Sequence, residues 1–348
     1  MNWPFITVAM PVRNEEAFIE ETLRQLLEQD YPADRFEIIV ADACSEDSTR
    51  QIVEALSRKY PQVILKTNRR ELSSSGRNVG FQNGRGEYFI VVDGHCRIDN
   101  RDFLKNVAEA FLKSGAECLG RPQPFVIPEQ PTWQRAIAIA RTSRLGHSSR
   151  SFIHADEEAF VSPVSMGCAY KKEVFEIIGF VDEAFDACED VEFNYRVEQA
   201  GFKTFFTPKI AVQYFPRENL KGLWRQMIRY GSGRTKFMFK HPKTTSFDML
   251  LLALFSLGIA LGPFSFLIHP YLFAFYPGVI LIYLILLTLE SLRLRKKEPL
   301  SFVLKLMTAF FVIHFSLGAG ILNGLIRKFF KPAHLKPGRK DNSVMETS

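Results

Sequence analysis

The chain has 348 residues, of which 47% are hydrophobic and 24% are charged. This composition excludes intrinsic disorder and suits one large or two ordinary domains with a real core. The formal net charge of +6 is modest, but lysine and arginine become denser from about residue 217 onward, where the long apolar runs lie. The N-terminus has neither a basic region nor a long apolar run, so we expect no cleavable signal peptide.

The first hundred residues alternate between short apolar strands and amphipathic helices. The expected strands cover residues 5–12, 36–41, 63–66 and 88–92, and the expected helices cover 15–27, 48–59 and 75–83. This alternation predicts an α/β fold with a mainly parallel central sheet covered by helices on both faces. Ligands of such sheets bind at the carboxyl ends of the strands. Because Asp42 and Asp93 each follow an expected strand, we expect both acids at one rim.

The chain between residues 120 and 206 is less regular. Several prolines precede an arginine-rich stretch, and we expect a loop, a short helix and a mobile segment over residues 120–165. A strand over residues 163–170, a helix over 171–178 and a strand over 204–206 complete the expected α/β domain.

The final third of the sequence is apolar over lengths that suit a membrane. Residues 249–289 contain no Asp, Glu, Lys or Arg, and a helix needs about 20 residues to cross the hydrocarbon core. Two crossings fit, with a turn near His269 and Pro270. A third charge-free run, residues 306–326, is also long enough to cross. We interpret these runs as membrane helices, and buried helices of a soluble protein are the alternative.

The segment before the first apolar run, "NLKGLWRQMIRY", has the pattern of a basic amphipathic helix. Its apolar face consists of Leu220, Leu223, Trp224, Met227 and Ile228, and Lys221, Arg225 and Arg229 lie off this face. Such a helix beside a membrane is expected to lie in the interface, although an ordinary surface helix has the same pattern.

The basic segments give conflicting evidence on orientation. The segment before residue 244 and the loop "RLRKKE" both belong inside by the positive-inside rule, which two crossings satisfy. The equally basic tail "RKFFKPAHLKPGRK" would lie outside after a third crossing. The last apolar run is therefore re-entrant or interfacial, or it crosses against the rule. We expect a multi-pass protein of the cell inner (plasma) membrane with its N-terminal domain in the cytoplasm, where the five unpaired cysteines would stay reduced.

Three acidic motifs carry candidate chemistry. In "VVDGH", Asp93 and His95 come from one short turn and could hold a divalent cation with open positions, although an aspartate there is more often a turn former. In "VADACSEDST", Asp42 stands at the rim where a ribose or base could be held, while the residues after it suit helix capping. In "CEDVEFNYR", Glu189 and Asp190 suit a solvated face, or a general base if partly buried.

Seven motifs occur in the order and spacing of one enzyme family. They are "MPVRNE", "VADACSEDST", "GRNVG", "VVDGH", "GCAY", "CEDVEFNYR" and "RQMIRYGSGR". Through them the chain resembles inverting family 2 glycosyltransferases of the GT-A fold over roughly residues 5 to 235. It looks most like membrane-anchored enzymes of bacterial exopolysaccharide assembly, such as the succinoglycan glucosyltransferase group.

The resemblance implies roles for the residues that match the donor and metal motifs. Pro11 and Glu15 would border the nucleotide pocket, and Asp42 would hold the uracil or ribose. Arg77 would lie near the nucleotide or its diphosphate. Asp93 and His95 stand in the family's metal motif, usually Asp-x-Asp, so a divalent cation (Mn²⁺ or Mg²⁺) is expected, with the histidine as a departure.

The resemblance also implies roles for residues nearer the acceptor. Asp190 matches the catalytic base of a Glu-Asp pair, in which Glu189 precedes it. Gln226, Arg229 and Tyr230 match a Gln-x-x-Arg-Trp motif that grips the acceptor or the diphosphate. Tyrosine in place of tryptophan weakens any inference of processive polymerisation.

The expected activity is transfer of a sugar from a nucleotide sugar, a UDP-hexose, to a lipid-linked saccharide in polysaccharide assembly. The expected partners are these two substrates and membrane lipid, with no nucleic acid. A polyprenyl-phosphate glycosyltransferase and a noncatalytic membrane scaffold on the same fold are the alternatives. The expected domains are a GT-A domain (1–215), an interfacial segment (216–246), a membrane domain of two to three helices (247–330) and a flexible basic tail (331–348).

Overall fold

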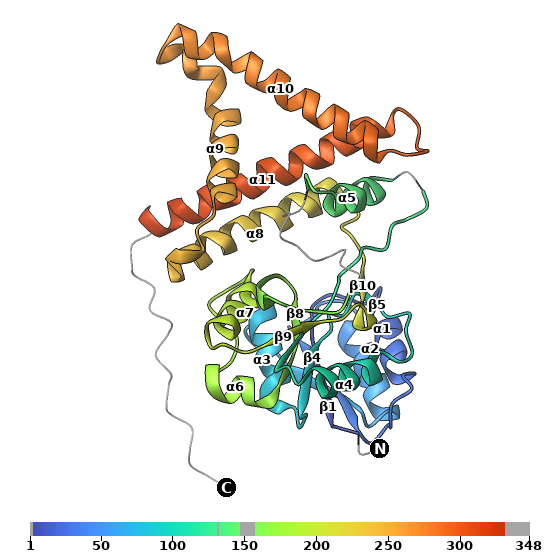
Figure 1. Cartoon of the computed structure of the whole chain (residues 1–348). Coiled ribbons are helices and arrows are strands. Elements are labelled where there is room, and N and C mark those ends of the chain that lie inside the picture. Colours follow the sequence, from blue (N-terminus) through green and yellow to red (C-terminus); the bar gives the residue numbers. More distant parts are fainter. Residues whose placement is uncertain (1–2, 131, 147–156, 331–348) are drawn as a thin grey trace.

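The structure is a computed structural model that describes residues 3–130, 132–146 and 157–330. An α/β domain forms one end of the molecule and a group of long helices forms the other (Figure 1). The expected flexible tail and part of the expected mobile segment lie outside the described residues. The expected succession of an α/β domain and apolar helices is confirmed.

An eight-stranded sheet forms the centre of the α/β domain, in the order β3-β2-β1-β4-β8-β6-β9-β7. The strands are β1 (Ile6–Val12), β2 (Phe36–Asp42), β3 (Val63–Thr67), β4 (Tyr88–Val91), β6 (Cys118–Gly120), β7 (Ala159–Val161), β8 (Gly167–Lys171) and β9 (Thr204–Phe206). Strands β1 to β4 are parallel, as expected, whereas β8 is antiparallel to β4 and β6. A second small sheet pairs β5 (Cys96–Arg97) with β10 (Gln213–Tyr214).

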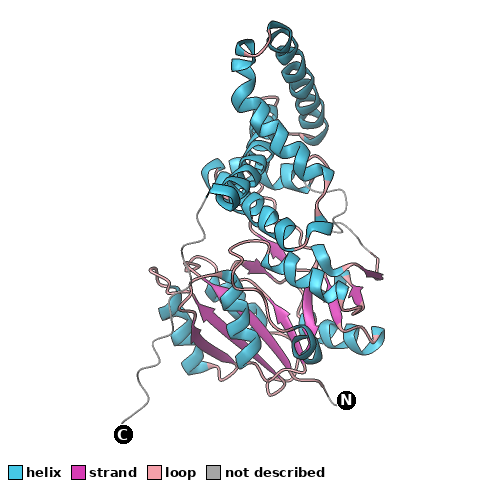
Figure 2. Cartoon of the chain, turned by 90° about the vertical axis from the view of Figure 1, so that its left-hand side faces the viewer, coloured by secondary structure: helices cyan, strands magenta, loops and turns pink. Residues whose placement is uncertain are grey.

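Helices cover both faces of the sheet (Figure 2). They are α1 (Ile19–Leu27), α2 (Thr49–Lys59), α3 (Ser73–Asn83), α4 (Phe103–Ser114), α6 (Lys172–Ile178) and α7 (Glu189–Gln199). One core cluster joins the sheet to α1, α2 and α4, and another joins its opposite face to α3, α6 and α7. Along β1, Val8 and Met10 enter the first cluster and Ala9 the second, as the alternation of side chains along a strand requires.

Two expected boundaries are wrong, for local reasons. The helix expected from residue 15 begins at Ile19, because the backbone N–H of Glu15 donates to Thr49 Oγ1 (2.7 Å). The strand expected over residues 163–170 begins at Gly167, because Pro163–Ser165 forms a 3₁₀ turn. Proline has no N–H and a fixed φ, which suits the first residue of such a turn better than the middle of a sheet.

The remaining long helices lie beyond the α/β domain, at the other end of the molecule (Figure 1). They are α5 (Trp133–Thr142), α8 (Leu220–Lys240), α9 (Phe247–Leu261), α10 (Pro270–Leu294) and α11 (Phe302–Phe330). Helices α5, α8 and α11 share one apolar cluster, and we call these three helices the helical platform. Helix α9 rises from the platform and α10 returns to it (Figures 1 and 2).

Three helical segments are long and apolar enough to cross a membrane, by length and composition: Phe247–Leu267, Pro270–Leu294 and Phe302–Phe330. They differ in how they pack. In the most apolar window of each segment, 11% and 6% of the first two are buried, against 44% of the third. Helices α9 and α10 therefore keep most of their apolar side chains exposed, whereas α11 packs against α8 as part of the helical platform.

Glycines allow α8 and α11 to approach closely. A Cβ atom at Gly231 of α8 would collide with the backbone carbonyl of Leu317, and one at Gly320 of α11 with that of Ile228. At Gly222, also in α8, the nearest atom to an added Cβ is Arg217 Cβ at 3.6 Å, an ordinary contact. Of these three positions, Gly231 and Gly320 require glycine for packing and Gly222 does not.

We therefore predict that Gly231→Ala separates α8 from α11 and lowers the free energy of unfolding by about 3 kcal/mol, because the added methyl meets backbone. Gly222→Ala, in the same helix, should change it by about 1 kcal/mol or less and in the stabilising direction. Chemical unfolding of the purified protein in detergent measures both changes. Equal effects of the two substitutions would contradict the packing described here.

Candidate active site

Three strand ends carry predicted site residues to one rim of the sheet. In the sheet register, Pro11 and Val12 of β1 pair with Ala41 and Asp42 of β2. Strand β4 lies on the other side of β1 and runs parallel to it, and Asp93 follows its end closely. The expectation that both aspartates lie at one rim is therefore met by the fold.

The Asp42 side chain is fully buried at this rim. Its Oδ1 accepts a hydrogen bond from the backbone N–H of Ser45 (3.2 Å), and its Oδ2 accepts one from Arg50 Nη1 (3.3 Å). These bonds fix the loop that follows β2. No interaction within the described residues joins the Asp42 carboxylate to the other predicted acids.

The turn that carries Asp93 and His95 is held by α1 and by the loop before it. Thr22 Oγ1 donates to the backbone carbonyls of Gly94 (3.0 Å) and Cys96 (2.8 Å), and His95 Nδ1 lies 2.8 Å from Glu15 Oε1. A Cβ at Gly94 would lie 2.8 Å from Val12 Cγ1, so only glycine fits this approach. Burial alone would lower the pKa of His95, but its contact with Glu15 outweighs burial and raises it.

Arg121 and Tyr214 make further contacts with this turn and with the end of strand β4. Arg121 Nη2 donates to the backbone carbonyl of Val91 at the end of β4 (2.9 Å) and to Tyr214 Oη (3.3 Å). The Tyr214 ring meets the His95 ring edge-on, with centroids 6.0 Å apart. Arg121 is 2% exposed, and its Nε and Nη1 have no hydrogen-bond partner among the described residues.

Arg77 of α3 joins the rim to the first turn of α7. Helix α3 comes close to β1 at Gly76, where an added Cβ would lie 2.9 Å from Pro11 Cβ. The next residue, Arg77, places its Nε 3.5 Å from Glu189 Oε1. Both side chains are largely buried, with exposed fractions of 15% and 7%.

The charges in this cluster are mutually dependent. Burial opposes the charged form of Arg77, but Glu189, Asp190 and Asp93 together outweigh it and raise its pKa. Burial raises the pKa of the Glu189 carboxyl, Arg77 opposes that rise, and the neighbouring Asp190 adds to it. Asp190 itself is partly exposed. The guanidinium of Arg77 is thus the shared counter-charge of three acids from two separate motifs.

The predicted residues of α8 do not share one set of partners. Arg229 Nε and Nη2 bind the Asp186 carboxylate (3.0 and 3.1 Å), and Nη2 also donates to the backbone carbonyl of Asp186 (2.7 Å). Gln226 Nε2 donates to Tyr230 Oη (3.3 Å), and Gln226 Oε1 accepts from Arg141 Nη1 (3.3 Å). Gln226 and Tyr230 therefore face α5, whereas Arg229 faces the loop before α7.

The structure thus brings only some of the predicted residues together. The charge of Asp93 acts on both Arg77 and His95. Asp42 contacts none of the other predicted acids among the described residues, and Arg229 makes contacts separate from those of Gln226 and Tyr230. The sequence analysis missed Arg50, Arg121, Asp186 and Tyr214. A signal existed for Arg121, because it follows strand β6 as Asp93 follows β4, but the spacing of the others gave none.

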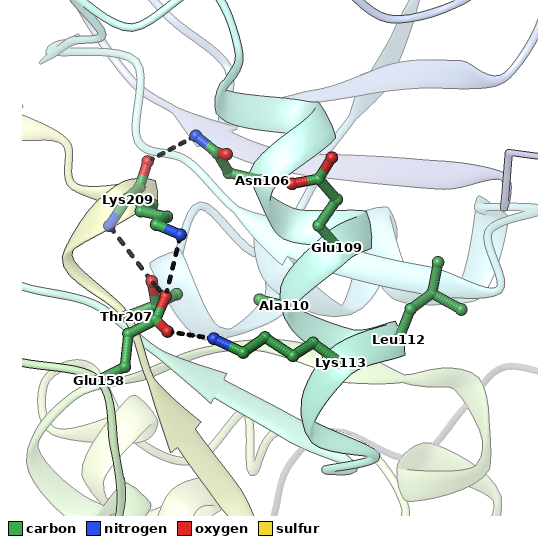
Figure 3. Close-up of a pocket in the computed structure, with 8 residues that line it drawn as sticks. All are labelled: Asn106, Glu109, Ala110, Leu112, Lys113, Glu158, Thr207 and Lys209. Carbon is green, nitrogen blue, oxygen red and sulfur yellow. Dashed lines mark hydrogen bonds and ion pairs between the residues drawn. The ribbon is translucent and has the colours of Figure 1, made fainter.

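A surface hollow elsewhere in the α/β domain contains none of these residues (Figure 3). It lies between α4 and the segment after β9. Glu158 binds Lys113 (2.7 Å), Lys209 (3.6 Å) and Thr207 Oγ1 (2.9 Å) there. Most of its polar side chains are paired with one another, and none of the predicted site residues lines it.

The chain is similar in sequence to known glycosyltransferases. The family model described as "Glycosyl transferase family 2" matches residues 7–178. A dolichyl N-acetyl-alpha-D-glucosaminyl phosphate 3-beta-D-2,3-diacetamido-2,3-dideoxy-beta-D-glucuronosyltransferase of Methanococcus voltae is 28% identical over 331 residues, 93% of this chain and 98% of that protein. Succinoglycan biosynthesis protein ExoA of Rhizobium meliloti is 28% identical over 270 residues, 74% of this chain and 76% of that protein.

A solved structure has the same fold. The mannosyltransferase of Pyrobaculum calidifontis, in complex with GDP-Man and Mn²⁺, superposes with a TM-score of 0.56 at 18% identity. The match covers 95% of this chain and 88% of that one. The expected GT-A fold is therefore confirmed, including its mainly parallel sheet.

The charge cluster predicts a non-additive effect on stability. Arg77→Met should lower the free energy of unfolding by about 3–5 kcal/mol, because it leaves Glu189 buried without its counter-charge. The double substitution Arg77→Met/Glu189→Gln should recover much of this loss. Chemical unfolding of the native protein, both single variants and the double variant gives the coupling energy. Strictly additive effects would show that the two side chains do not depend on each other.

Proposed function

Because this chain belongs to glycosyl transferase family 2, we propose that it transfers a sugar from a nucleotide sugar to a lipid-linked saccharide, with inversion at the anomeric carbon. The observation that carries the proposal is the convergence of Asp93, Glu189 and Asp190 on the buried guanidinium of Arg77. This arrangement sets a candidate base beside a candidate site for a diphosphate. Both are needed for a single in-line displacement.

Asp190 is the general base of the proposal. Glu189 is buried against Arg77, whereas Asp190 is partly exposed at the start of α7 and can meet an acceptor hydroxyl. Asp190 takes the hydroxyl proton as the acceptor oxygen bonds to the anomeric carbon. The bond from that carbon to the nucleoside diphosphate breaks, and the diphosphate leaves with the electron pair. No covalent enzyme intermediate is required.

Asp93 and His95 would hold a divalent cation at the diphosphate. The contact of His95 Nδ1 with Glu15 leaves Nε2 as the free ring nitrogen, which is the usual arrangement of a histidine ligand and its supporting carboxylate. Among the described residues no group of three or more His, Cys, Asp or Glu could hold a metal, so nucleotide oxygens and water would complete the coordination. A bound cation would neutralise charge on the leaving diphosphate. The Mn²⁺ in the Pyrobaculum mannosyltransferase complex supports this assignment.

The remaining predicted residues complete the proposed substrate sites. Pro11, Glu15 and Asp42 border the nucleotide, which we propose is that of a UDP-hexose. Gln226 and Tyr230 lie nearer the acceptor. The names of the Methanococcus and Rhizobium relatives, which refer to a dolichyl-linked sugar phosphate and to succinoglycan biosynthesis, support a lipid-linked acceptor in polysaccharide or glycan assembly.

We propose that the protein is held at the inner membrane by α9 and α10, with the α/β domain on the cytoplasmic side. The basic loop at Arg293–Lys297 and the basic part of α8 then lie on the same side, as the positive-inside rule requires. Helix α11, packed along α8, lies in the interface instead of crossing. This arrangement removes the conflict that a third crossing would create for the basic tail.

A polyprenyl-phosphate glycosyltransferase is the second candidate, with the bare lipid phosphate as acceptor. Mass spectrometry of the lipid product distinguishes it, because the product would carry a single sugar. A noncatalytic scaffold would be expected only without the base or the metal motif, and Asp93 and Asp190 are both present.

The base assignment predicts that Asp190→Asn lowers the turnover number by about 10²–10⁴-fold while nucleotide affinity is retained, because only proton transfer is lost. The matched control is Glu198→Gln, an exposed carboxylate in the same helix, which should leave turnover unchanged. Transfer from UDP-glucose by membranes carrying each variant, with UDP binding measured in parallel, checks this. Native turnover in Asp190→Asn would remove the residue from the base role.

The cation assignment predicts loss of activity in chelator and its return with Mn²⁺ or Mg²⁺. Asp93→Asn should abolish this return, and Glu15→Gln should raise the Mn²⁺ concentration for half-maximal activity by about 10–100-fold, since it loosens His95. Mn²⁺ binding by calorimetry in the presence of UDP gives a second readout. Full activity in chelator would exclude the cation.

A further inference from the structure

Arg141, near the end of α5, is a half-buried cation without an acidic partner among the described residues. Its guanidinium lies over the Phe125 ring, 4.8 Å from the centroid, and its Nη1 donates to Gln226 Oε1. No Asp or Glu of the described residues forms an ion pair with it. Burial lowers the pKa of Arg141, and the nearby Arg217 lowers it further, although the Tyr230 side chain opposes this. The positive charge is therefore held in place but not neutralised.

Arg229, in contrast to Arg141, has an acidic partner. Sequence resemblance assigns it to the acceptor or the diphosphate, but its guanidinium already makes two contacts with the Asp186 carboxylate. The Asp186 carboxylate offsets the charge of Arg229, and a phosphate would have to compete with it. Of the two arginines, Arg141 has the charge available for an anion.

Arg217 adds a second cation without an ion-pair partner in the described residues. Its aliphatic stem lies against Gly222 at the start of α8, and its side chain is exposed. Its charge opposes the protonated forms of both Arg141 and His95. The preceding residue, Pro216, is held to α5, because its carbonyl accepts a hydrogen bond from Gln134 Nε2 (3.1 Å). The two positive charges of Arg141 and Arg217 repel each other, and an anion bound by both would offset this repulsion.

A short backbone path connects this pair of cations to the metal motif. The backbone of Phe125 pairs with Tyr214, and Tyr214 pairs in turn with Cys96, the residue after His95. The Arg141 guanidinium, stacked on Phe125, therefore lies next to the candidate active site and on the side of α5.

Helix α5 also belongs to the helical platform, which faces α9 and α10 (Figure 1). Ala136, Ile137 and Ala140 pack with Leu223 and other apolar side chains of α8 and α11. Gln134 and Arg135, at the start of α5, bind the carbonyl of Pro216 (3.1 Å) and the carboxylate of Glu298 (2.7 Å). Arg141 is thus held at the boundary between the active site and the proposed membrane surface.

We propose that Arg141 and Arg217 bind the phosphate that joins the acceptor sugar to its lipid. This proposal rests on the proposed function, because it assigns the anion to the lipid-linked acceptor. Guanidinium groups match the oxygens of a phosphate, and a phosphate between them would relieve their repulsion. The other phosphate source is the donor diphosphate, which the experiment must separate.

The test measures binding of a C55 polyprenyl monophosphate and of the matched C55 polyprenol to the full-length protein in detergent, without nucleotide sugar. Tryptophan fluorescence reports binding, since Trp133 and Trp224 lie in α5 and α8. The native protein should bind the phosphate about tenfold more tightly than the polyprenol. Arg141→Gln should lose this preference, Arg141→Lys should keep part of it, and Arg217→Gln should weaken it.

The matched control is Arg144→Gln, an exposed arginine just after α5, which should behave as native. Unchanged UDP affinity with Mn²⁺ shows that each variant is folded, and Arg217→Gln, at an exposed position, tests the site even if Arg141→Gln does not fold. Equal binding of phosphate and polyprenol by the native protein would overturn the proposal, as would equal losses in Arg141→Gln and Arg144→Gln. Weakened UDP binding with unchanged lipid binding would assign the arginines to the donor. Because no transfer is measured, failure here is separate from failure of the Asp190 test.

Discussion

The ion pair between Arg77 and Glu189 is the interaction on which the site depends. A buried carboxylate beside a second acid is unfavourable unless a cation is near, and Arg77 is that cation for Glu189, Asp190 and Asp93. Its position follows from Gly76, which lets α3 approach β1. Gly76 is needed for the close approach of α3 to β1, and the next residue, Arg77, is needed as the counter-charge. These two adjacent residues therefore link the packing of the sheet to the acids at the start of α7.

The turn after β4 shows a second constraint, which is rigidity. Thr22, Glu15, Arg121 and Tyr214 come from separate elements and all contact the short segment around Asp93 and His95, directly or through the end of β4. If Asp93 and His95 hold a cation as proposed, a loose turn would weaken its binding, because ordering the two side chains costs conformational entropy. The supporting contacts fix the turn in advance.

Much of the fold and part of the site could be predicted from the sequence. Strand ends follow from hydrophobic periodicity, and parallel strands bring their ends to one rim, which places Asp42 and Asp93. Pairing between side chains from distant elements has no such period. The ion pair of Arg229 with Asp186 and the hydrogen bond of Arg141 with Gln226 could not be deduced from the spacing of residues in the sequence. Each depends on how α8 packs against its neighbours. The burial of α11 could not be deduced from the sequence either, because its composition matches that of a helix that crosses a membrane.

The close packing of α8 on α11 gives the helical platform a consequence for catalysis. The backbones touch at Gly231 and Gly320, and apolar side chains of the two helices pack in one cluster, so the two helices form one tightly packed layer. Helix α8 carries Gln226 and Tyr230 in the same layer, and α5 adds Arg141. If α9 and α10 fix this layer at a membrane surface, the height of the active site above the lipid is set by helix packing. In that arrangement the proposed lipid-linked acceptor would meet Asp190, the proposed base, at a constant distance from its anchor, without any movement of the α/β domain.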